Sequence, residues 1–229
     1  MTAQLFTPVE LGGVTLPNRI VVSPMCQYAA VDGSAQPWHQ VHYGMLSMSG
    51  AGLLCLEATH VEREGRITQG CLGLYSDENE AALKPVIDWV RGWMPGVKLG
   101  VQLAHAGRKA SAQRPWKGGG PLTQADAPDL PWTTYGPSAL AYDPDKNWHT
   151  PVALDAVGLK RVKEAFAAAD VAFLVADFTQ KDPAIAQELQ RRGRAGVPMY
   201  LWYPAGASEP VVLPELLNQE LVIGLVEGR

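Results

Sequence analysis

Short apolar runs alternate with longer segments of helical periodicity along the first three quarters of the chain. Three runs have the length of strands, Ile20 to Ser23, Leu53 to Leu56 and Lys98 to Leu103. The second run is continuously apolar rather than alternating, as is typical of a strand buried on both faces. The segments Trp38 to Met48 and Asp77 to about Trp93 lie between these runs and are predicted helices.

Boundary residues support two of the predicted helices. Asp77 is the expected N-cap of the second helix, with Glu80 three residues later, and Pro95-Gly96 ends it. Pro85 falls inside this helix, where a kink is expected. Asp155 is the expected N-cap of a third helix that runs through Ala169.

The resulting order βαβαβα predicts parallel strands with helices packed outside the sheet. Crossovers of this kind are right-handed, which leaves either a doubly wound sheet or a (β/α)8 barrel. Periodicity does not decide between them, although the absence of GxGxxG after the first strand disfavours a dinucleotide-binding fold. A Gly- and Pro-rich stretch, Gln113 to Pro137, is long enough to indicate a surface or functional loop.

The last sixty residues follow another pattern and predict a small α+β module. The expected elements are a strand at 171–176, a helix at 183–192, two antiparallel strands at 199–203 and 210–213, and a short helix from Pro214. We therefore place a boundary between residues 169 and 170.

Composition narrows the functional classes. The 229 residues are 47% hydrophobic and 18% charged with a net charge of −4, which gives no electrostatic reason to bind nucleic acid or an anionic membrane. No apolar stretch is long enough to span a bilayer, and the first residues do not resemble a secretory signal. The three cysteines are an odd number without CxxC spacing, so a reduced, cytoplasmic protein is expected.

Chemically useful side chains follow each predicted strand, at the edge where active sites of parallel α/β folds lie. These residues are Ser23, Pro24, Met25, Cys26 and Tyr28 after the first strand, Glu57, Ala58 and Thr59 after the second, and Gln102, His105, Arg108 and Lys109 at the end of the third. A thiol, a phenol, an amide and cations at one rim can hydrogen bond to a planar heterocycle. The five histidines have no metal-ligand spacing, so no metal is expected.

Several motifs in this part of the chain resemble the old yellow enzyme family, of the bacterial class with a cysteine beside the flavin. They are LFTPVELGGVTLPNRIVVSPMCQY, LEATHVEREGRIT, LGLYSDE, GVQLAHAGRKAS and the QRPWKGGGPL…YGPSALAYD loop, and the match covers residues 1–169 in order. The resemblance implies a (β/α)8 TIM barrel that binds FMN, takes hydride from NADPH or NADH, and passes it to the β-carbon of an activated alkene.

The resemblance also assigns roles to single residues. Ser23, Pro24, Met25 and Cys26 match the segment along the flavin ring, where the cysteine modulates the flavin potential, and Ala58 and Gln102 match further flavin contacts. Tyr28 matches a substrate-contacting tyrosine and is the catalytic candidate. Other interpretations stay open, because Cys26 could be a small buried hydrophobe and Tyr28 a core aromatic.

After residue 169 the chain departs from that family. The motif with two histidines and a tyrosine that ends the family's fourth strand is absent from it, and a closed barrel needs about 250 residues. VAFLVADFTQKDPAIAQELQRRGRAGVPMYLWYPAGASEPVVLPELL instead resembles the second half of a thioredoxin-like domain of thiol–disulfide interchange proteins, with Gly196-Val197-Pro198 at the cis-proline turn. The expected fold is α/β, a partial (β/α)8 barrel of three βα units at 1–169 followed by a thioredoxin-like fragment at 170–229.

The predicted function is that of an NAD(P)H:flavin oxidoreductase that reduces activated alkenes through FMN. The alternative is a catalytically inactive chimeric or truncated fusion protein, because the phosphate anchors of the family come from later strands. The expected partner is a small-molecule alkene, without nucleic acid or membrane. A homo-oligomer is also expected, because a partial barrel exposes unpaired strand edges.

Overall fold

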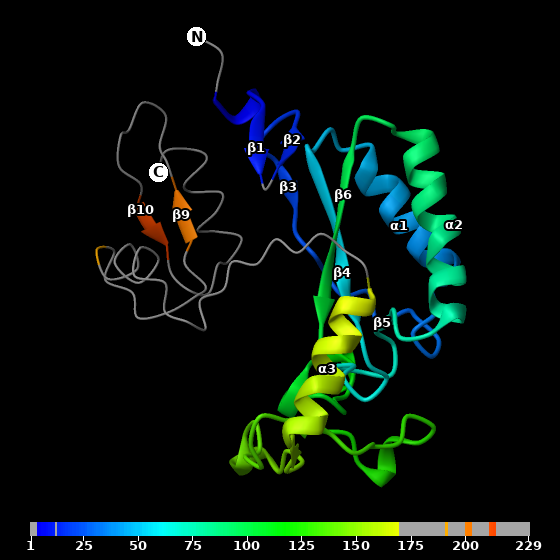
Figure 1. Cartoon of the computed structure of the whole chain (residues 1–229), viewed down its shortest axis with the longest axis vertical. Helices are drawn as coiled ribbons and strands as arrows, with labels where there is room; N and C mark the ends of the chain where they lie inside the picture. Colours follow the sequence, from blue (N-terminus) through cyan, green and yellow to red (C-terminus); the bar gives the residue numbers. More distant parts are fainter. Residues whose placement is uncertain (1–3, 12, 170–190, 192–199, 203–210, 214–229) are drawn as a thin grey trace. The chain divides into compact units, whose positions relative to one another are not determined.

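The computed structural model describes residues 4–11, 13–169, 191, 200–202 and 211–213 (Figure 1). The chain divides into two compact units, residues 1–172 and 173–229. Each unit is described by itself. Which domains the two units represent, and the predicted boundary at 169/170, stay predictions.

The first unit is built on a parallel sheet with β4 (Leu53–His60) at its centre. On one side β4 pairs with β3 (Val21–Val22) and, at its carboxyl end, with β5 (Leu72–Gly73). On the other side it pairs along its whole length with β6 (Lys98–Ala104). All of these pairings are parallel, which confirms the α/β class and the strand direction predicted from the βαβαβ order.

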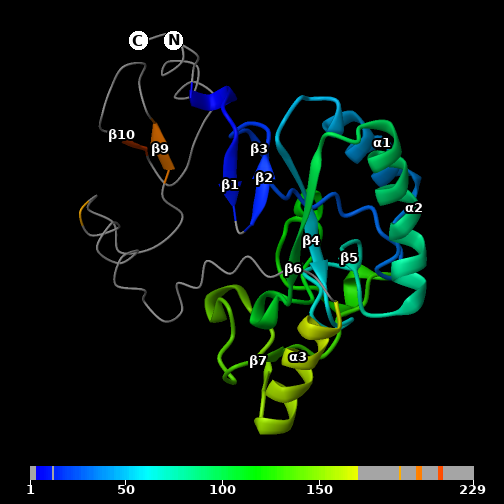
Figure 2. The same cartoon turned by 45° about the horizontal axis from the view of Figure 1, so that its top comes forward.

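Two helices, α1 (Pro37–Ser47) and α2 (Asp77–Trp93), cover one face of this sheet (Figures 1 and 2). They cover it because both the helices and the alternate strand positions carry apolar side chains that leave water together. The buried core comprises Ala30, Tyr43, Leu54, Leu56, Leu72, Leu83, Val86 and Val90. Each fully buried aliphatic side chain contributes about 1.5–3 kcal/mol to this packing.

The structure corrects two predicted boundaries. The central strand continues four residues past Leu56 to His60, because its carboxyl end pairs with both β5 and β6. The N-cap of α2 is Ser76 rather than Asp77, and its side chain accepts a hydrogen bond from the Asn79 backbone N–H at 3.3 Å. Asp77 instead lies in the first helical turn, where its negative charge suits the helix dipole.

The third helix, α3 (Ala156–Ala168), has the predicted N-cap but a different place from the one expected. Asp155 accepts a hydrogen bond from the Gly158 N–H at 2.7 Å. None of the helix residues is buried, so α3 does not cover the sheet as α1 and α2 do. It contacts the rim after β4, where the Arg161 Nε lies 2.8 Å from a carboxyl oxygen of Glu62.

Short elements without a recognisable sequence pattern complete the first unit. They are the antiparallel hairpin β1 (Val9–Leu11) and β2 (Val14–Leu16), the parallel pair β7 (Tyr135–Gly136) and β8 (Val152–Ala153), and 3-10 turns at Gln4–Phe6, Gly107–Lys109, Pro115–Lys117, Gln124–Asp126 and Pro144–Lys146. Two of these turns lie in the predicted loop, which is thus folded back on itself rather than extended.

Two strands of the second unit are described, β9 (Tyr200–Trp202) and β10 (Val211–Leu213). They pair antiparallel with Val211 opposite Trp202, as the sequence predicted for the last two strands. The predicted strand at 171–176, the turn at 196–198 and the final helix lie outside the described residues, and only Arg191 of the predicted 183–192 helix is described. The thioredoxin-like fold of this unit therefore stays a prediction. In the part of the chain that is described, no helix is long and apolar enough to cross a membrane.

Candidate functional site

The sheet face opposite the helices presents two of the predicted site residues side by side. Leu99 and Val101 of β6 pack against the core under the helices, so the alternate residue Gln102 lies on the other face. Ala58 of β4 is the direct Cα partner of Gln102. Because partners in a sheet point to the same face, Ala58 and Gln102 share this inner face.

A β-bulge in β4 is what brings Ala58 to the inner face. Leu56 pairs with Val101 and Ala58 pairs with Gln102, so Glu57 is one extra residue between two paired positions. Leu54 and Leu56 face the helical core, and strict alternation would send Ala58 there as well. The extra residue reverses the alternation.

Cys26 extends this arrangement across a third segment. The Ala58 backbone N–H donates a hydrogen bond to the Cys26 sulfur, and the Cys26 side chain is half-buried. Cys26, Ala58 and Gln102 are thus neighbours, and we call them the inner row. The structure brings together the three positions that the sequence placed at separate strand ends, while their roles toward a flavin stay predictions.

The members of the inner row differ in exposure. Ala58 is 6% exposed and supports the face rather than presenting a surface. Gln102 is exposed, and among the residues that the structure describes its amide has no hydrogen-bond partner. The row therefore offers a half-buried thiol and a free amide on either side of a small methyl group.

The other predicted residues lie on the segment that leaves β3. Ser23 and Met25 are exposed and Pro24 is half-buried, so these three side chains do not form a packed core. Tyr28 lies outside the hydrophobic core cluster, and its ring meets the Trp116 ring edge-on at a centroid distance of 5.6 Å. Burial is the main factor that raises the pKa of Tyr28 above its usual value, so the phenol keeps its proton at neutral pH.

The buried carboxyl group of Glu57 holds the Cys26–Tyr28 segment in place. One Glu57 oxygen accepts a hydrogen bond from the Gln27 backbone N–H at 2.9 Å, and the other accepts one from the Tyr43 hydroxyl at 3.0 Å. In return the Glu57 N–H, freed by the bulge, donates to the Tyr43 oxygen at 3.1 Å. The sequence placed Glu57 at the rim but gave no indication of this network, because its partners lie 14 and 30 residues away.

The imidazole of His39 also lies next to the Glu57 carboxyl group. Its Nδ1 accepts a hydrogen bond from the Gln36 backbone N–H at 2.9 Å, which puts the proton of a neutral imidazole on Nε2. This Nε2 lies 3.4 Å from a Glu57 oxygen, and both side chains are fully buried. The Gln36 N–H thus satisfies one ring nitrogen of His39, which lies in the helix predicted from Trp38 to Met48.

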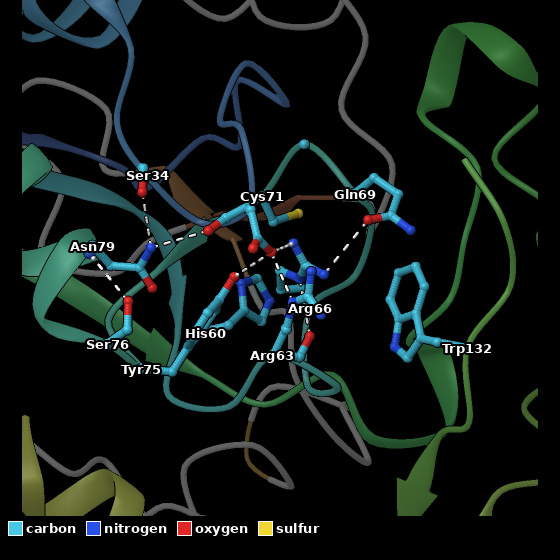
Figure 3. Close-up of polar contacts among 12 residues, drawn as sticks. Ser34, His60, Arg63, Arg66, Gln69, Cys71, Tyr75, Ser76, Asn79 and Trp132 are labelled. Atoms are coloured by element: carbon cyan, nitrogen blue, oxygen red, sulfur yellow. Dashed lines mark hydrogen bonds and ion pairs between the residues drawn. The ribbon is translucent and has the colours of Figure 1, made fainter. Parts of the chain in front are cut away.

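A second polar cluster fixes the loop that follows Tyr28 (Figure 3). Asp32, which has a positive φ of 45°, accepts hydrogen bonds at one oxygen from Arg63 Nε at 2.8 Å, Arg66 Nη1 at 3.2 Å and the Tyr75 hydroxyl at 3.3 Å. The Arg63 guanidinium is the main cause that lowers the pKa of Asp32 below its usual value. Arg66 is only 4% exposed and also lies over the rings of Tyr75 and Trp132.

His60, at the end of β4, is a fully buried histidine with one bare ring nitrogen. Its Nδ1 lies 3.0 Å from the Leu72 carbonyl oxygen, which can only accept, so Nδ1 carries the proton. The Nε2 has no hydrogen-bond partner among the described residues. Burial is the main reason why the pKa of His60 falls to about 4.

His105 follows β6 and contacts a carboxylate and a backbone N–H rather than a carbonyl. Its Nδ1 accepts a hydrogen bond from the Gly107 N–H at 3.2 Å, which puts the proton on Nε2, 3.2 Å from a Glu62 oxygen. Glu62 also pairs with Arg161 of α3. His105 therefore helps to hold the rim and α3 together.

Comparison with known proteins gives consistent matches. The sequence model of the NADH:flavin oxidoreductase / NADH oxidase family matches residues 4–178. An NADH:flavin oxidoreductase of Gibberella zeae is 44% identical over 115 residues, 50% of this chain and 27% of the relative. An NADPH dehydrogenase of Listeria welshimeri is 48% identical over 110 residues, 47% of this chain and 32% of the relative. The chain thus matches about a third of the length of these curated relatives.

Solved structures give the same result for the fold. Morphinone reductase superposes with a TM-score of 0.57 at 26% identity, covering 85% of this chain and 46% of that one. An old yellow enzyme from Pichia sp. AKU4542 superposes with a TM-score of 0.58 at 22% identity, covering 72% of this chain and 41% of that one, which supports the fold alone. Since the family model matches most of the sequence, the chain belongs to the NADH:flavin oxidoreductase / NADH oxidase family.

Proposed function

We propose that residues 4–169 form the first three βα units of an FMN-binding (β/α)8 barrel and that the flavin ring lies against the inner row. The observation that carries this proposal is the adjacency of Cys26, Ala58 and Gln102 on the sheet face opposite the helices. Membership of a flavin oxidoreductase family supplies the expected ligand.

The chemistry of the inner row fits an isoalloxazine ring. The free amide of Gln102 can both donate and accept hydrogen bonds, as the alternating carbonyl and imide groups of the flavin pyrimidine edge require. The methyl group of Ala58 leaves room for a flat ring, and the Cys26 thiol lies beside it. The Glu57 contact to the Gln27 N–H keeps the Cys26 segment from shifting when a ligand arrives.

We propose NAD(P)H-dependent reduction of activated alkenes as the reaction of this site. FMN, when bound, accepts hydride from the nicotinamide and donates hydride to the alkene. The protonated phenol of Tyr28 is placed to donate a hydrogen bond to a polar group of the substrate. The names of relatives as NADPH dehydrogenases, and a morphinone reductase complex with tetrahydroNAD, support this assignment.

Reconstitution with FMN tests the proposal. The purified chain is loaded with excess FMN, passed through gel filtration, and assayed anaerobically for NADPH oxidation with 2-cyclohexenone. We expect flavin absorbance in the protein peak and turnover that falls about tenfold or more in Tyr28→Phe. Tyr142→Phe, on an exposed loop tyrosine, is the matched control and should keep full turnover.

The same assay separates this proposal from the catalytically inactive alternative. An inactive chimeric or truncated protein would retain no flavin and would oxidise NADPH no faster than buffer. We also propose that residues 170–229 are a separate thioredoxin-like fragment. Limited proteolysis should then cut close to Asp170 and leave two stable products.

A further inference from the structure

Two of the three cysteines, Cys26 and Cys71, lie against each other although they are far apart in the sequence. Their thiol groups share a hydrogen bond. Cys26 is half-buried, whereas Cys71 is 0% exposed. Figure 3 shows Cys71 beside the polar cluster that fixes the neighbouring loop. The third cysteine, Cys55, belongs to β4.

Backbone contacts hold the two cysteine-bearing segments together. The Ala30 N–H donates to the Gly70 carbonyl oxygen at 2.9 Å, and the Gly73 N–H donates to the Gly33 oxygen at 2.9 Å. A Cβ added to Gly70 would lie 2.3 Å from the Tyr28 carbonyl oxygen, so the two backbones are in direct contact. The backbone segments that carry Cys26 and Cys71 are therefore held side by side.

The surroundings favour one negative charge shared by the pair. The shared hydrogen bond with Cys26, together with hydrogen bonds from Thr68, lowers the pKa of Cys71 to about 7. The Thr68 backbone N–H lies 3.4 Å from the Cys71 sulfur and its hydroxyl 3.5 Å. The same shared proton, burial and the nearby Glu57 raise the pKa of Cys26. The pair thus loses its first proton near neutral pH and keeps its second.

We propose that Cys26 and Cys71 form a redox-sensitive pair that closes into an intramolecular disulfide when the protein meets a hydroperoxide. As the Cys26 sulfur attacks an oxygen of hydrogen peroxide, its proton passes to the neighbouring Cys71 thiolate and on to the departing oxygen, the O–O bond breaks, and a sulfenic acid and water form. The Cys71 thiolate then attacks the Cys26 sulfur, the S–O bond breaks, and the oxygen leaves as a second water after it takes up one proton from solvent. Two thiols are oxidised and one hydrogen peroxide is reduced to two waters.

The difference in solvent exposure gives each cysteine a separate role in these two reaction steps. Only Cys26 can meet a peroxide from solvent, because Cys71 is fully buried. Cys71 lies where it can resolve the sulfenic acid before a second peroxide oxidises it further. The disulfide would remove the Cys26 thiol from the inner row, and this consequence for flavin binding rests on the proposed function.

Peptide mapping of the flavin-free chain tests the disulfide without any reliance on flavin. Cys26 and Cys55 share one tryptic peptide, since no Lys or Arg lies between Arg19 and Arg63. The Cys55→Ser variant is therefore treated with hydrogen peroxide, alkylated and digested. We expect a Cys26–Cys71 cross-linked peptide, the loss of two hydrogens from the intact mass, and reversal by dithiothreitol. In wild-type protein, chymotrypsin, which cleaves after Tyr28, gives the same assignment.

The Cys71→Ser variant tests the role of Cys71 as the resolving cysteine. Without its resolving partner Cys26 should advance to sulfinic acid, and dithiothreitol should no longer restore it. The proposal is overturned if peroxide leaves both thiols alkylatable, or links Cys26 to Cys55 or to a second chain instead. The affinity for FMN is also compared before and after oxidation. This comparison tests only the consequence for flavin binding, because a chain that never binds FMN can still form the disulfide.

Discussion

Acidification provides a quantitative test of the architecture at the end of β4, through His60. The His60 Nδ1 donates to the Leu72 carbonyl and the buried Nε2 has no described partner, so a second proton would bring an unsolvated charge. The pKa of His60 accordingly lies at about 4 in the fold, against an ordinary value of 6.5. Below pH 6.5 the His60 imidazole of the unfolded chain binds a proton, whereas in the folded chain it stays neutral until the pH approaches 4. Stability is therefore full above pH 6.5 and is lost as the pH falls toward 4.

The size of the effect follows from the two pKa values. Between about pH 7.5 and pH 5 this single histidine should cost about 2 kcal/mol of unfolding free energy, and about 3 kcal/mol near pH 4. The assay is urea denaturation at these pH values, for wild type and for His60→Asn. The asparagine amide can keep the hydrogen bond to the Leu72 carbonyl but does not titrate.

Wild type should lose about 2 kcal/mol more than His60→Asn between about pH 7.5 and pH 5. The difference between the two proteins cancels the contribution of His42, whose pKa is also lowered by burial. Equal losses in the two proteins would refute a buried, neutral His60. So would a wild type that gains stability on acidification.

Urea denaturation at neutral pH also tests three further substitutions. Glu57→Gln should lower the unfolding free energy by about 1.5–3 kcal/mol, because the Gln27 N–H and the Tyr43 hydroxyl each need an acceptor oxygen and an amide has only one. The matched control Glu64→Gln, at an exposed glutamate, should change the unfolding free energy little. Gly70→Ala should cost about 1–3 kcal/mol or more, because its Cβ would meet the Tyr28 oxygen. Asp155→Ala should cost about 1 kcal/mol through the lost cap of α3. Unchanged midpoints would contradict each assignment.

Local sequence patterns predicted much of the first unit. The apolar run from Leu53 and the helical periodicity around α1 and α2 correspond to elements whose type follows from neighbours in the chain. The bulge at Glu57 was not predictable in this way, because an extra residue is defined only by the pairing of β4 with β6. The exposed position of α3 was missed for the same reason, since an N-cap starts a helix without saying where it packs.

The candidate site was predicted in its members but not in its connections. Motifs in the sequence pointed to Cys26, Ala58 and Gln102, and the sheet makes them neighbours. The partners of Glu57 and the pairing of Cys26 with Cys71 depend on contacts between distant segments that carry no spacing rule.

The central claim is that FMN rests on the inner row, and a flavin titration of three proteins tests it most directly. Fluorescence quenching gives the FMN dissociation constants of wild type, Gln102→Ala and Gln40→Ala. Gln40 is an exposed glutamine of α1, in the helical layer that covers the sheet face opposite the inner row. Loss of one or two hydrogen bonds should weaken FMN binding of Gln102→Ala by about 3- to 30-fold, and leave Gln40→Ala at the wild-type value. Equal affinity of all three proteins for FMN, or binding by none, would contradict the account.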